Sequence, residues 1–330
     1  LPDPEFAISN VYEAPVNDTE KVFCNLFASI LELEKVGATD NFFDLGGTSL
    51  VVTRVIIEAD TAGLHIAYGD LFAHPTPRAL ASLFEESDKS AANDNEITGY
   101  DYSRIDRLLE NNTLDAFRNG EHRNIRSALV TGATGFLGIH ILKRLIDSEV
   151  GNIYALVRGK DAKLAENRLK TLSFYYFDNT FEDIIGTRLH IVTGDVTDDL
   201  ETILKGLEID TIFNCAAIVK HFSEGTEIED VNIGGAQRCV DYALEHNARL
   251  IHISTASTRG LSVNGYPQAS EVFDEQRLYF GQFLGNKYIY SKFIAERIIL
   301  EAVATKGLDA KIMRVGNLSA RSTDGEFQAN

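Results

Sequence analysis

The spacing of apolar residues changes character once along the chain. In the first part, apolar positions recur at helical intervals, and polar or glycine-containing stretches separate them. The helical segments are residues 17–36, the run from Ser49 through Ile56, and the run from Thr76 through Leu83. Asn17 or Asp18 can cap the first of them. This pattern predicts a small all-α bundle of three or four short helices around one core.

From residue 127 onward, short apolar runs with strand character alternate with segments of helical periodicity. We expect strands at 127–131, 152–157, 188–193, 210–215, 249–254 and 310–315. We expect helices at 136–148, 161–173, 198–206, 228–247 and 286–305. This alternation predicts a doubly wound α/β domain with a parallel sheet, helices on both faces and a ligand site at the carboxyl ends of the strands.

The stretch between the two patterns is short of apolar residues. Residues 87–99 are small and polar, which predicts a linker. Residues 101–118 regain helical spacing, so we expect a helix there that docks on either domain. The expected organisation is an upstream linker at 1–14, a helical domain at 15–87, an interdomain linker at 88–124 and an α/β domain at 125–330.

Composition narrows the class of protein. No apolar run approaches the ~18 residues of a membrane span. The N-terminus has neither a signal-peptide pattern nor an initiator Met, which suggests a piece of a longer polypeptide. The three cysteines match no metal spacing, so we expect no metal site and a reducing cytoplasm. The net charge, 31 − 49 = −18, argues against nucleic acid and anionic membranes as partners.

Three glycines follow the first predicted strand, and a helical pattern begins among them. Gly132 permits a tight turn, Gly135 lets a pyrophosphate approach the backbone, and Gly138 lets the helix pack against the strand. The start of the helix then offers free N–H groups to phosphates. The turn therefore predicts a dinucleotide site. Its expected contacts are Gly132, Thr134, Gly135, Phe136, Leu137 and Gly138.

The second strand ends at a cation where NAD-binding domains place an acid. Arg158 stands there, and Arg168 follows in the next predicted helix. A cation favours the 2′-phosphate of NADP, so NADPH is the expected cofactor. After the third strand, Asp195 can accept from the adenine amino group or cap the next helix. We assign Asp195, Val196 and Ala216 to the same site.

Tyr288 and Lys292 stand four residues apart in a predicted helix and therefore share one face. An ammonium beside a phenol lowers the phenol pKa from about 10, which suits Tyr288 to deliver a proton. Tyr290 has Ile294 at the corresponding position and lacks this partner. A cluster of hydroxyl residues at 254–257 ends the fifth strand and supplies a second polar group.

Ser49 stands at a predicted helix start beside two glycines. A serine there can be a plain N-cap or an exposed attachment point for a phosphate-linked group. The motif Asp-Asn-Phe-Phe-Asp-Leu-Gly-Gly-Thr-Ser-Leu closely resembles the core motif of peptidyl carrier (thiolation) domains of nonribosomal peptide synthetases. The resemblance spans residues 15–86. It implies 4′-phosphopantetheine on Ser49, a phosphopantetheinyl transferase as partner, and upstream adenylation and condensation domains in the same polypeptide.

The glycine turn, the hydroxyl cluster and the Tyr-x-x-x-Lys pair together resemble the extended short-chain dehydrogenase/reductase family. More narrowly, residues 125–330 resemble the thioester reductase domains that terminate nonribosomal peptide synthetases. The resemblance implies a catalytic triad of Thr255, Tyr288 and Lys292, in which Lys292 also holds the nicotinamide ribose. Ser254 and Ser257 remain alternatives to Thr255.

These resemblances imply reduction of a carrier-bound acyl or peptidyl thioester by NADPH to an aldehyde, with a further step to an alcohol left open. Three alternatives are an aminoadipate or carboxylic acid reductase fragment, a nucleotide-sugar enzyme of the same fold, and an inactive docking or cyclising module. Family members continue with a C-terminal substrate subdomain, whereas this sequence stops at Asn330. We therefore expect that subdomain to be missing and the substrate pocket of these residues to be incomplete.

Overall fold

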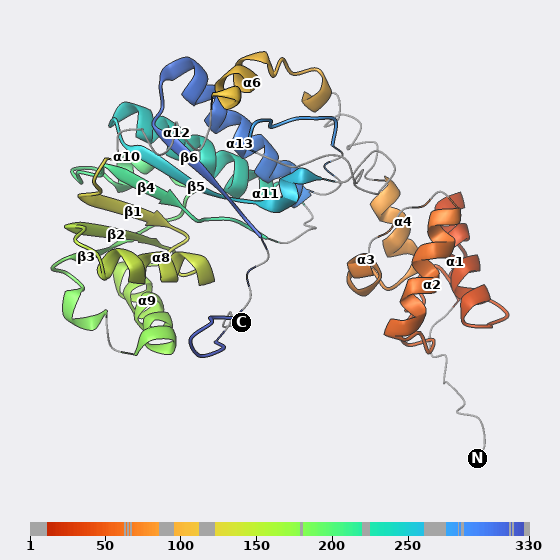
Figure 1. The fold of residues 1–330 in the computed structure, drawn as a ribbon. Coiled ribbons are helices and arrows are strands. Elements are labelled where there is room, and N and C mark those ends of the chain that lie inside the picture. Colours follow the sequence, from red (N-terminus) through yellow and green to blue (C-terminus); the bar gives the residue numbers. More distant parts are fainter. Residues whose placement is uncertain are drawn as a thin grey trace. The chain divides into compact units, whose positions relative to one another are not determined.

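The computed structural model divides the chain into two compact units, Leu1–Tyr100 and Asp101–Asn330 (Figure 1). It describes residues 12–62, 64, 66, 68–85, 96–111, 123–178, 181–219, 225–260, 275–282, 284, 287–316, 318 and 320–326. Residues 1–11 of the predicted upstream linker, and residues 88–95 and 112–122 of the predicted interdomain linker, lie outside the described residues. Within the described part, no helix is both long and apolar enough to cross a membrane.

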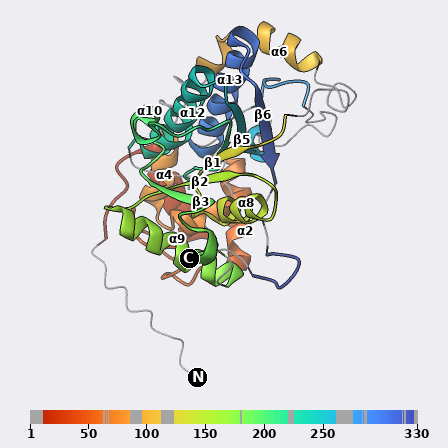
Figure 2. The same ribbon diagram turned by 90° about the vertical axis from the view of Figure 1, so that its left-hand side faces the viewer.

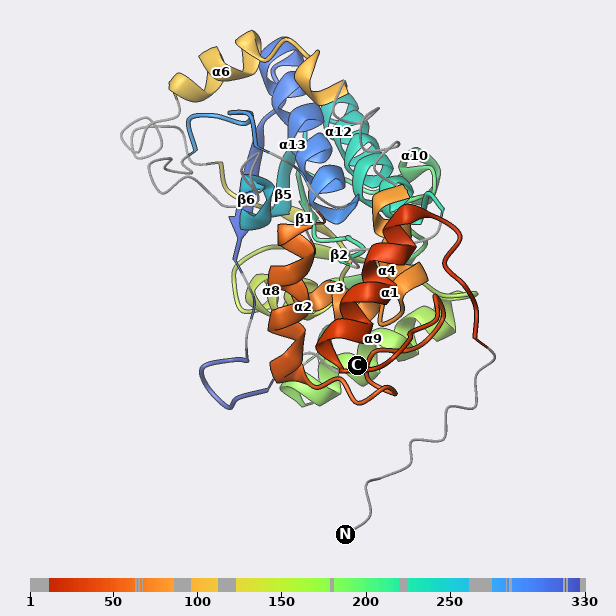
Figure 3. The same cartoon turned by 90° about the vertical axis from the view of Figure 1, so that its right-hand side faces the viewer.

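The first unit is a small helical bundle, shown from one side in Figure 3. Its helices are α1 (Asp18–Ile30), α2 (Ser49–Thr61), α3 (Tyr68–Ala73) and α4 (Pro77–Glu85). Phe23, Phe27 and Phe42 are fully buried at its centre, among other apolar side chains. Burial of three aromatic rings gives so small a unit a large share of its stability. The predicted bundle is confirmed.

The start of α1 agrees with the sequence prediction, whereas its end does not. Asn17 accepts a hydrogen bond from the Glu20 backbone N at 2.7 Å, so the predicted cap is confirmed. The predicted extension to residue 36 is wrong, because α1 ends at Ile30 and Glu32 has a φ of 55°. Leu33 still packs against the core, although it lies outside the helix, so its apolar spacing reflects its burial and not helical structure.

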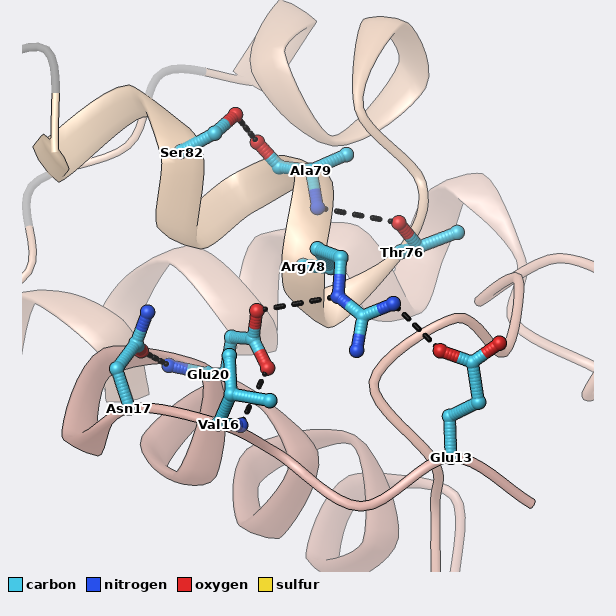
Figure 4. Close-up of polar contacts among 8 residues, drawn as sticks. All are labelled: Glu13, Val16, Asn17, Glu20, Thr76, Arg78, Ala79 and Ser82. Carbon is cyan, nitrogen blue, oxygen red and sulfur yellow. Dashed lines mark hydrogen bonds and ion pairs between the residues drawn. The ribbon is translucent and has the colours of Figure 1, made fainter.

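A buried carboxylate ties the segment before α1 to α4 (Figure 4). Glu20 is 2% exposed and accepts from Arg78 Nε at 3.2 Å and from Val16 N at 2.8 Å. Arg78 also donates to Glu13 at 2.5 Å, and the Glu13 carbonyl accepts from Ala38 N at 2.8 Å. The segment from Glu13 to Val16 is therefore part of the folded bundle, although it has no regular structure.

The second unit is built on a six-stranded sheet in the order β3-β2-β1-β4-β5-β6, and all neighbouring strands are parallel. The strands are β1 (Ser127–Thr131), β2 (Asn152–Val157), β3 (Leu189–Thr193), β4 (Thr211–Asn214), β5 (Arg249–Thr255) and β6 (Ala310–Val315). Each lies at its predicted place within two residues. The order reverses between β1 and β4, which is where such sheets open a ligand crevice.

Helices cover both faces of this sheet, as predicted, and Figures 1 and 2 show the two layers. One face carries α8 (Phe136–Ile146) and α9 (Ala162–Phe177), and the other carries α10 (Leu200–Ile203), α12 (Gly235–Glu245) and α13 (Lys287–Lys306). The helix predicted at 228–247 is interrupted. It consists of α11 (Glu227–Glu229), a π-helical turn at Asp230–Gly234, and α12.

The helix predicted at 101–118 belongs to the second unit. It is observed as α6 (Ser103–Glu110), which lies beside α13 in Figures 1 and 3. Ile105 and Leu109 are buried, and Tyr102 stacks on Tyr279 with ring centroids 5.0 Å apart. The rest of the predicted helix, including Leu114 and Phe117, lies outside the described residues.

Candidate active site

A pocket of about 180 Å³ lies at the carboxyl ends of β1 to β4, where the strand order reverses. The predicted cofactor residues among its lining are Gly132, Thr134, Gly135, Arg158, Arg168, Asp195, Val196 and Ala216. The structure therefore brings together eight residues that are spread over 85 positions of sequence. Phe136, Leu137, Gly138 and Lys292 are not part of that lining.

The glycine turn is as tight as the sequence predicted. Gly132 has a φ of +62°, and a Cβ there would lie 2.7 Å from the Ala216 backbone N. A Cβ on Gly138 would collide with the Gly132 carbonyl, so α8 packs directly on the turn. Phe136 begins α8, and its ring lies tilted against that of His140, with ring centroids 4.7 Å apart.

The rim of the pocket carries two arginines and one carboxylate. Arg158 Nε lies 3.6 Å from Asp195 Oδ2, and the Arg158 side chain is 64% exposed. Asp195 also accepts from Thr197 N at 3.0 Å in the turn that follows β3. It does not cap the next helix, because Asp199 is the N-cap of α10. Arg168 approaches the same pocket from α9. Two exposed guanidinium groups that line one pocket are suited to binding a phosphate.

Tyr288 and Thr255 meet through a side-chain hydrogen bond. Tyr288 lies in the first turn of α13, and Thr255 is the last residue of β5. The alternative Ser254 donates to Glu296 at 2.5 Å. The other alternative, Ser257, is exposed, and its backbone N donates to the Thr255 hydroxyl at 3.1 Å. Of these three hydroxyl residues, Thr255 is the one that forms a hydrogen bond with Tyr288.

The predicted lowering of the Tyr288 pKa is wrong. Burial raises the pKa of Tyr288, and the Thr255 hydrogen bond offsets only part of that rise. Lys292 is 2% exposed and donates from Nζ to the Ile253 carbonyl at 2.5 Å. Its Nζ is thus held against the β5 backbone. Burial lowers the pKa of Lys292 to about 8, although the Glu296 carboxylate opposes that shift.

Three buried polar residues around the tyrosine helix were not singled out from the sequence. Asn232, in the π-helical turn, bonds both backbone groups of Ile218 and donates to Ser291 Oγ at 2.9 Å. It thereby ties the pocket wall to α13. Glu296 is fully buried and accepts from Arg314 Nη2 at 2.7 Å, which ties α13 to β6.

The third residue is His252, whose Nε2 lies 3.5 Å from Lys292 Nζ. Spacing could have suggested Glu296, which follows Lys292 by one helical turn. No local signal marks Asn232 or His252, because their partners are distant in sequence. Among the described residues, no cluster of His, Cys, Asp or Glu could hold a metal ion.

The fold and the pocket define a dinucleotide-binding α/β domain of the reductase type, preceded by a helical bundle. The chain belongs to the family described as "Male sterility protein", whose NAD-binding model matches residues 130–330. A second model, described as "Phosphopantetheine attachment site", matches residues 21–84. The chain therefore joins a carrier domain to an NAD(P)-binding reductase domain.

Two solved structures and a curated relative are similar to this chain. The structure of a thiolation-reductase di-domain from an archaeal nonribosomal peptide synthetase is 41% identical, with a TM-score of 0.71, and the match covers 97% of this chain and 67% of that one. The Aureusimine biosynthetic cluster reductase domain is 30% identical, with a TM-score of 0.57, over 68% of this chain and 58% of that one. Isonitrile lipopeptide synthase of Mycobacterium tuberculosis is 29% identical over 97% of this chain, which spans 14% of that protein.

Proposed function

We propose that this chain carries an acyl or peptidyl thioester on phosphopantetheine at Ser49 and releases it reductively, with NADPH, as an aldehyde. The observation that supports this most is the Thr255–Tyr288 hydrogen bond at the end of β5, in the same domain as the cationic pocket. The start of α2 at Ser49 agrees with an attachment site there. The side chains of Ser49 and Leu50 lie outside the described part of the structure.

The pocket residues fit NADPH. Gly132, Thr134 and Gly135 line the pocket, and Gly135 is the N-cap of α8, so the positive end of that helix lies beside the expected position of the phosphates. Arg158 and Arg168 would hold the 2′-phosphate, and Ala216 leaves room beside the turn. When bound, NADPH would supply hydride to the thioester carbonyl carbon.

The chain's own residues would manage the charge on the carbonyl oxygen. Thr255 and Tyr288 would hydrogen-bond that oxygen as negative charge develops on it. Because burial raises the pKa of Tyr288, the phenol keeps its proton at neutral pH and can donate it as a general acid. The resulting hemithioacetal would break its C–S bond, which returns the thiol to the carrier arm and frees the aldehyde.

The shared chain would also raise the rate of encounter. A substrate tethered by a flexible link reaches an effective concentration of roughly millimolar at its partner site. The tether thus gives a physical reason for the carrier and the reductase to be covalently joined.

Product analysis tests the reductive assignment. The intact polypeptide is loaded by a phosphopantetheinyl transferase, supplied with its acyl substrate and NADPH, and its product is identified by mass spectrometry. We expect an aldehyde, or an alcohol if a second reduction follows. Recovery of only a free acid or a cyclised product would overturn the proposal.

Arg158→Ala is expected to reduce the preference for NADPH over NADH by about tenfold, because one charged hydrogen-bond donor to the 2′-phosphate is lost. Titration of both nucleotides by fluorescence measures the ratio of their Kd values. Lys160→Ala is the matched control, because Lys160 is an exposed cation two residues away that does not line the pocket. An unchanged ratio in Arg158→Ala would remove this residue from the site.

A further inference from the structure

A row of buried polar side chains crosses the apolar sheet beneath the proposed site. Thr131 pairs in register with Asn214, and Asn214 pairs in register with His252, on β1, β4 and β5. All three are at most 2% exposed. Thr131 Oγ1 donates to Asn214 Oδ1 at 2.7 Å, and Asn214 Nδ2 lies 3.1 Å from His252 Nδ1. The row ends at Lys292, whose Nζ lies 3.5 Å from His252 Nε2.

The hydrogen bonds of this row all run in one direction. Ala216 N, in the pocket wall, donates to Thr131 Oγ1 at 3.2 Å. The Thr131 hydrogen then goes to the Asn214 carbonyl oxygen, and the Asn214 amide NH₂ faces His252 Nδ1. Burial holds the pKa of His252 well below its usual value, so the imidazole is neutral. A neutral imidazole that accepts at Nδ1 carries its proton on Nε2.

The Nε2–H of His252 therefore points at Lys292 Nζ. A hydrogen-bond donor that faces an ammonium disfavours its charged form and can instead donate to a free amine. The other groups around Nζ favour the charged, ammonium form of Lys292. The Ile253 carbonyl accepts from it, and Cys215 and Glu296 favour its charge. Tyr288 lies on the same helix face, and Arg314 is paired with Glu296.

We propose that His252 is a positioning residue whose Nε2–H, fixed by Asn214, opposes the ammonium form of Lys292 and makes this lysine the group that limits reduction at alkaline pH. Burial and this donor together keep the Lys292 charge sensitive to small changes around it. The role in reduction rests on the function proposed above. The placement of protons along the row does not rest on it.

The first test measures Lys292 directly in the 330-residue chain. Lysine labelled with ¹³C at Cε is titrated by NMR, and the Lys292 signal is assigned by its absence in Lys292→Arg. We expect His252→Leu to raise the pKa of Lys292 by about one unit, because the opposing donor is removed. If His252 instead accepts a hydrogen bond from the ammonium, the same variant lowers the pKa. A lowered or unchanged pKa would overturn the proposal.

Two further variants guard this result. Asn214→Leu leaves His252 in place but removes the group that donates to its Nδ1. The imidazole proton can then sit on Nδ1, so that Nε2 accepts from Lys292 and the lysine pKa is again expected to rise. If the pKa does not rise, the role of Asn214 is contradicted. This variant keeps the test decisive if His252→Leu fails to fold. His190→Leu is the matched control, since His190 stacks on Tyr154 at 5.3 Å on the edge strand β3, which does not pair with β5. It should leave the Lys292 titration unchanged.

The second test follows NADPH oxidation by the loaded intact polypeptide as a function of pH. In the wild type we expect activity to fall as the pH rises through about 8, as Lys292 loses its charge. In His252→Leu this alkaline limit should move upward by about one pH unit, in step with the NMR shift. An alkaline limit that stays in place while the NMR value moves would overturn the role in reduction. If the wild type reduces no thioester at all, the proposed function fails, while the NMR titration still decides the role of His252.

Discussion

Tyr288→Phe is expected to lower the turnover of carrier-bound thioester by about 10²–10⁴-fold, because the proposed general acid is lost while the ring remains. NADPH affinity should stay the same, since the Tyr288 side chain does not line the nucleotide pocket. Single-turnover NADPH oxidation in the loaded intact polypeptide measures the rate, and a fluorescence titration measures the affinity.

Tyr290→Phe is the matched control for this variant. It removes the same hydroxyl from the same helix, two residues further on, at a buried position, whereas the hydrogen bond of Thr255 goes to Tyr288. We expect its turnover to stay close to that of the wild type. If Tyr288→Phe keeps full turnover, the proton comes from elsewhere and the proposed mechanism is wrong.

Ser49→Ala is expected to abolish loading and, with it, all release of product from the tethered chain. The reason is chemical, because alanine has no oxygen to form the phosphodiester. Intact-protein mass spectrometry after incubation with a phosphopantetheinyl transferase and coenzyme A measures loading. The wild type should gain one phosphopantetheine group, and Ser49→Ala should gain none.

Thr48→Ala provides the comparison, because Thr48 is an exposed hydroxyl residue immediately before the same helix. It should load normally. A soluble acyl-pantetheine thioester should still be reduced by Ser49→Ala, which separates a carrier defect from a damaged reductase. Normal loading of Ser49→Ala would place the attachment elsewhere on the chain.

Much of the fold could be predicted because its signals are local. The β/α alternation, the glycine turn and the Asn17 cap each depend on residues within one or two elements, and all six strands were placed from them. The helix ends were less certain. Leu33 has helical spacing from α1 but packs from an irregular segment, and the π-helical turn breaks a segment whose periodicity looks continuous.

The electrostatics of the site could not be predicted in the same way. Helical spacing placed Tyr288 and Lys292 on one face, but it could not show that the Ile253 carbonyl holds the ammonium. The pKa of a buried group depends on desolvation and on partners from other elements. His252 faces Lys292 because β5 packs beneath α13, and that contact joins residues 40 positions apart. Only the folded chain brings such groups together.

The ion pairs of Arg78 with Glu13 and Glu20 have a practical consequence for exchanging carrier modules between synthetases. A graft joined at the first residue of α1 would discard Glu13, which accepts from Arg78, and the Val16 amide, which donates to the buried Glu20 carboxylate. A buried charge that loses a hydrogen bond costs about 1–3 kcal/mol, a large part of what so small a bundle can spare. A junction placed before Tyr12 would keep Glu13, Val16 and their hydrogen bonds in the transplanted bundle.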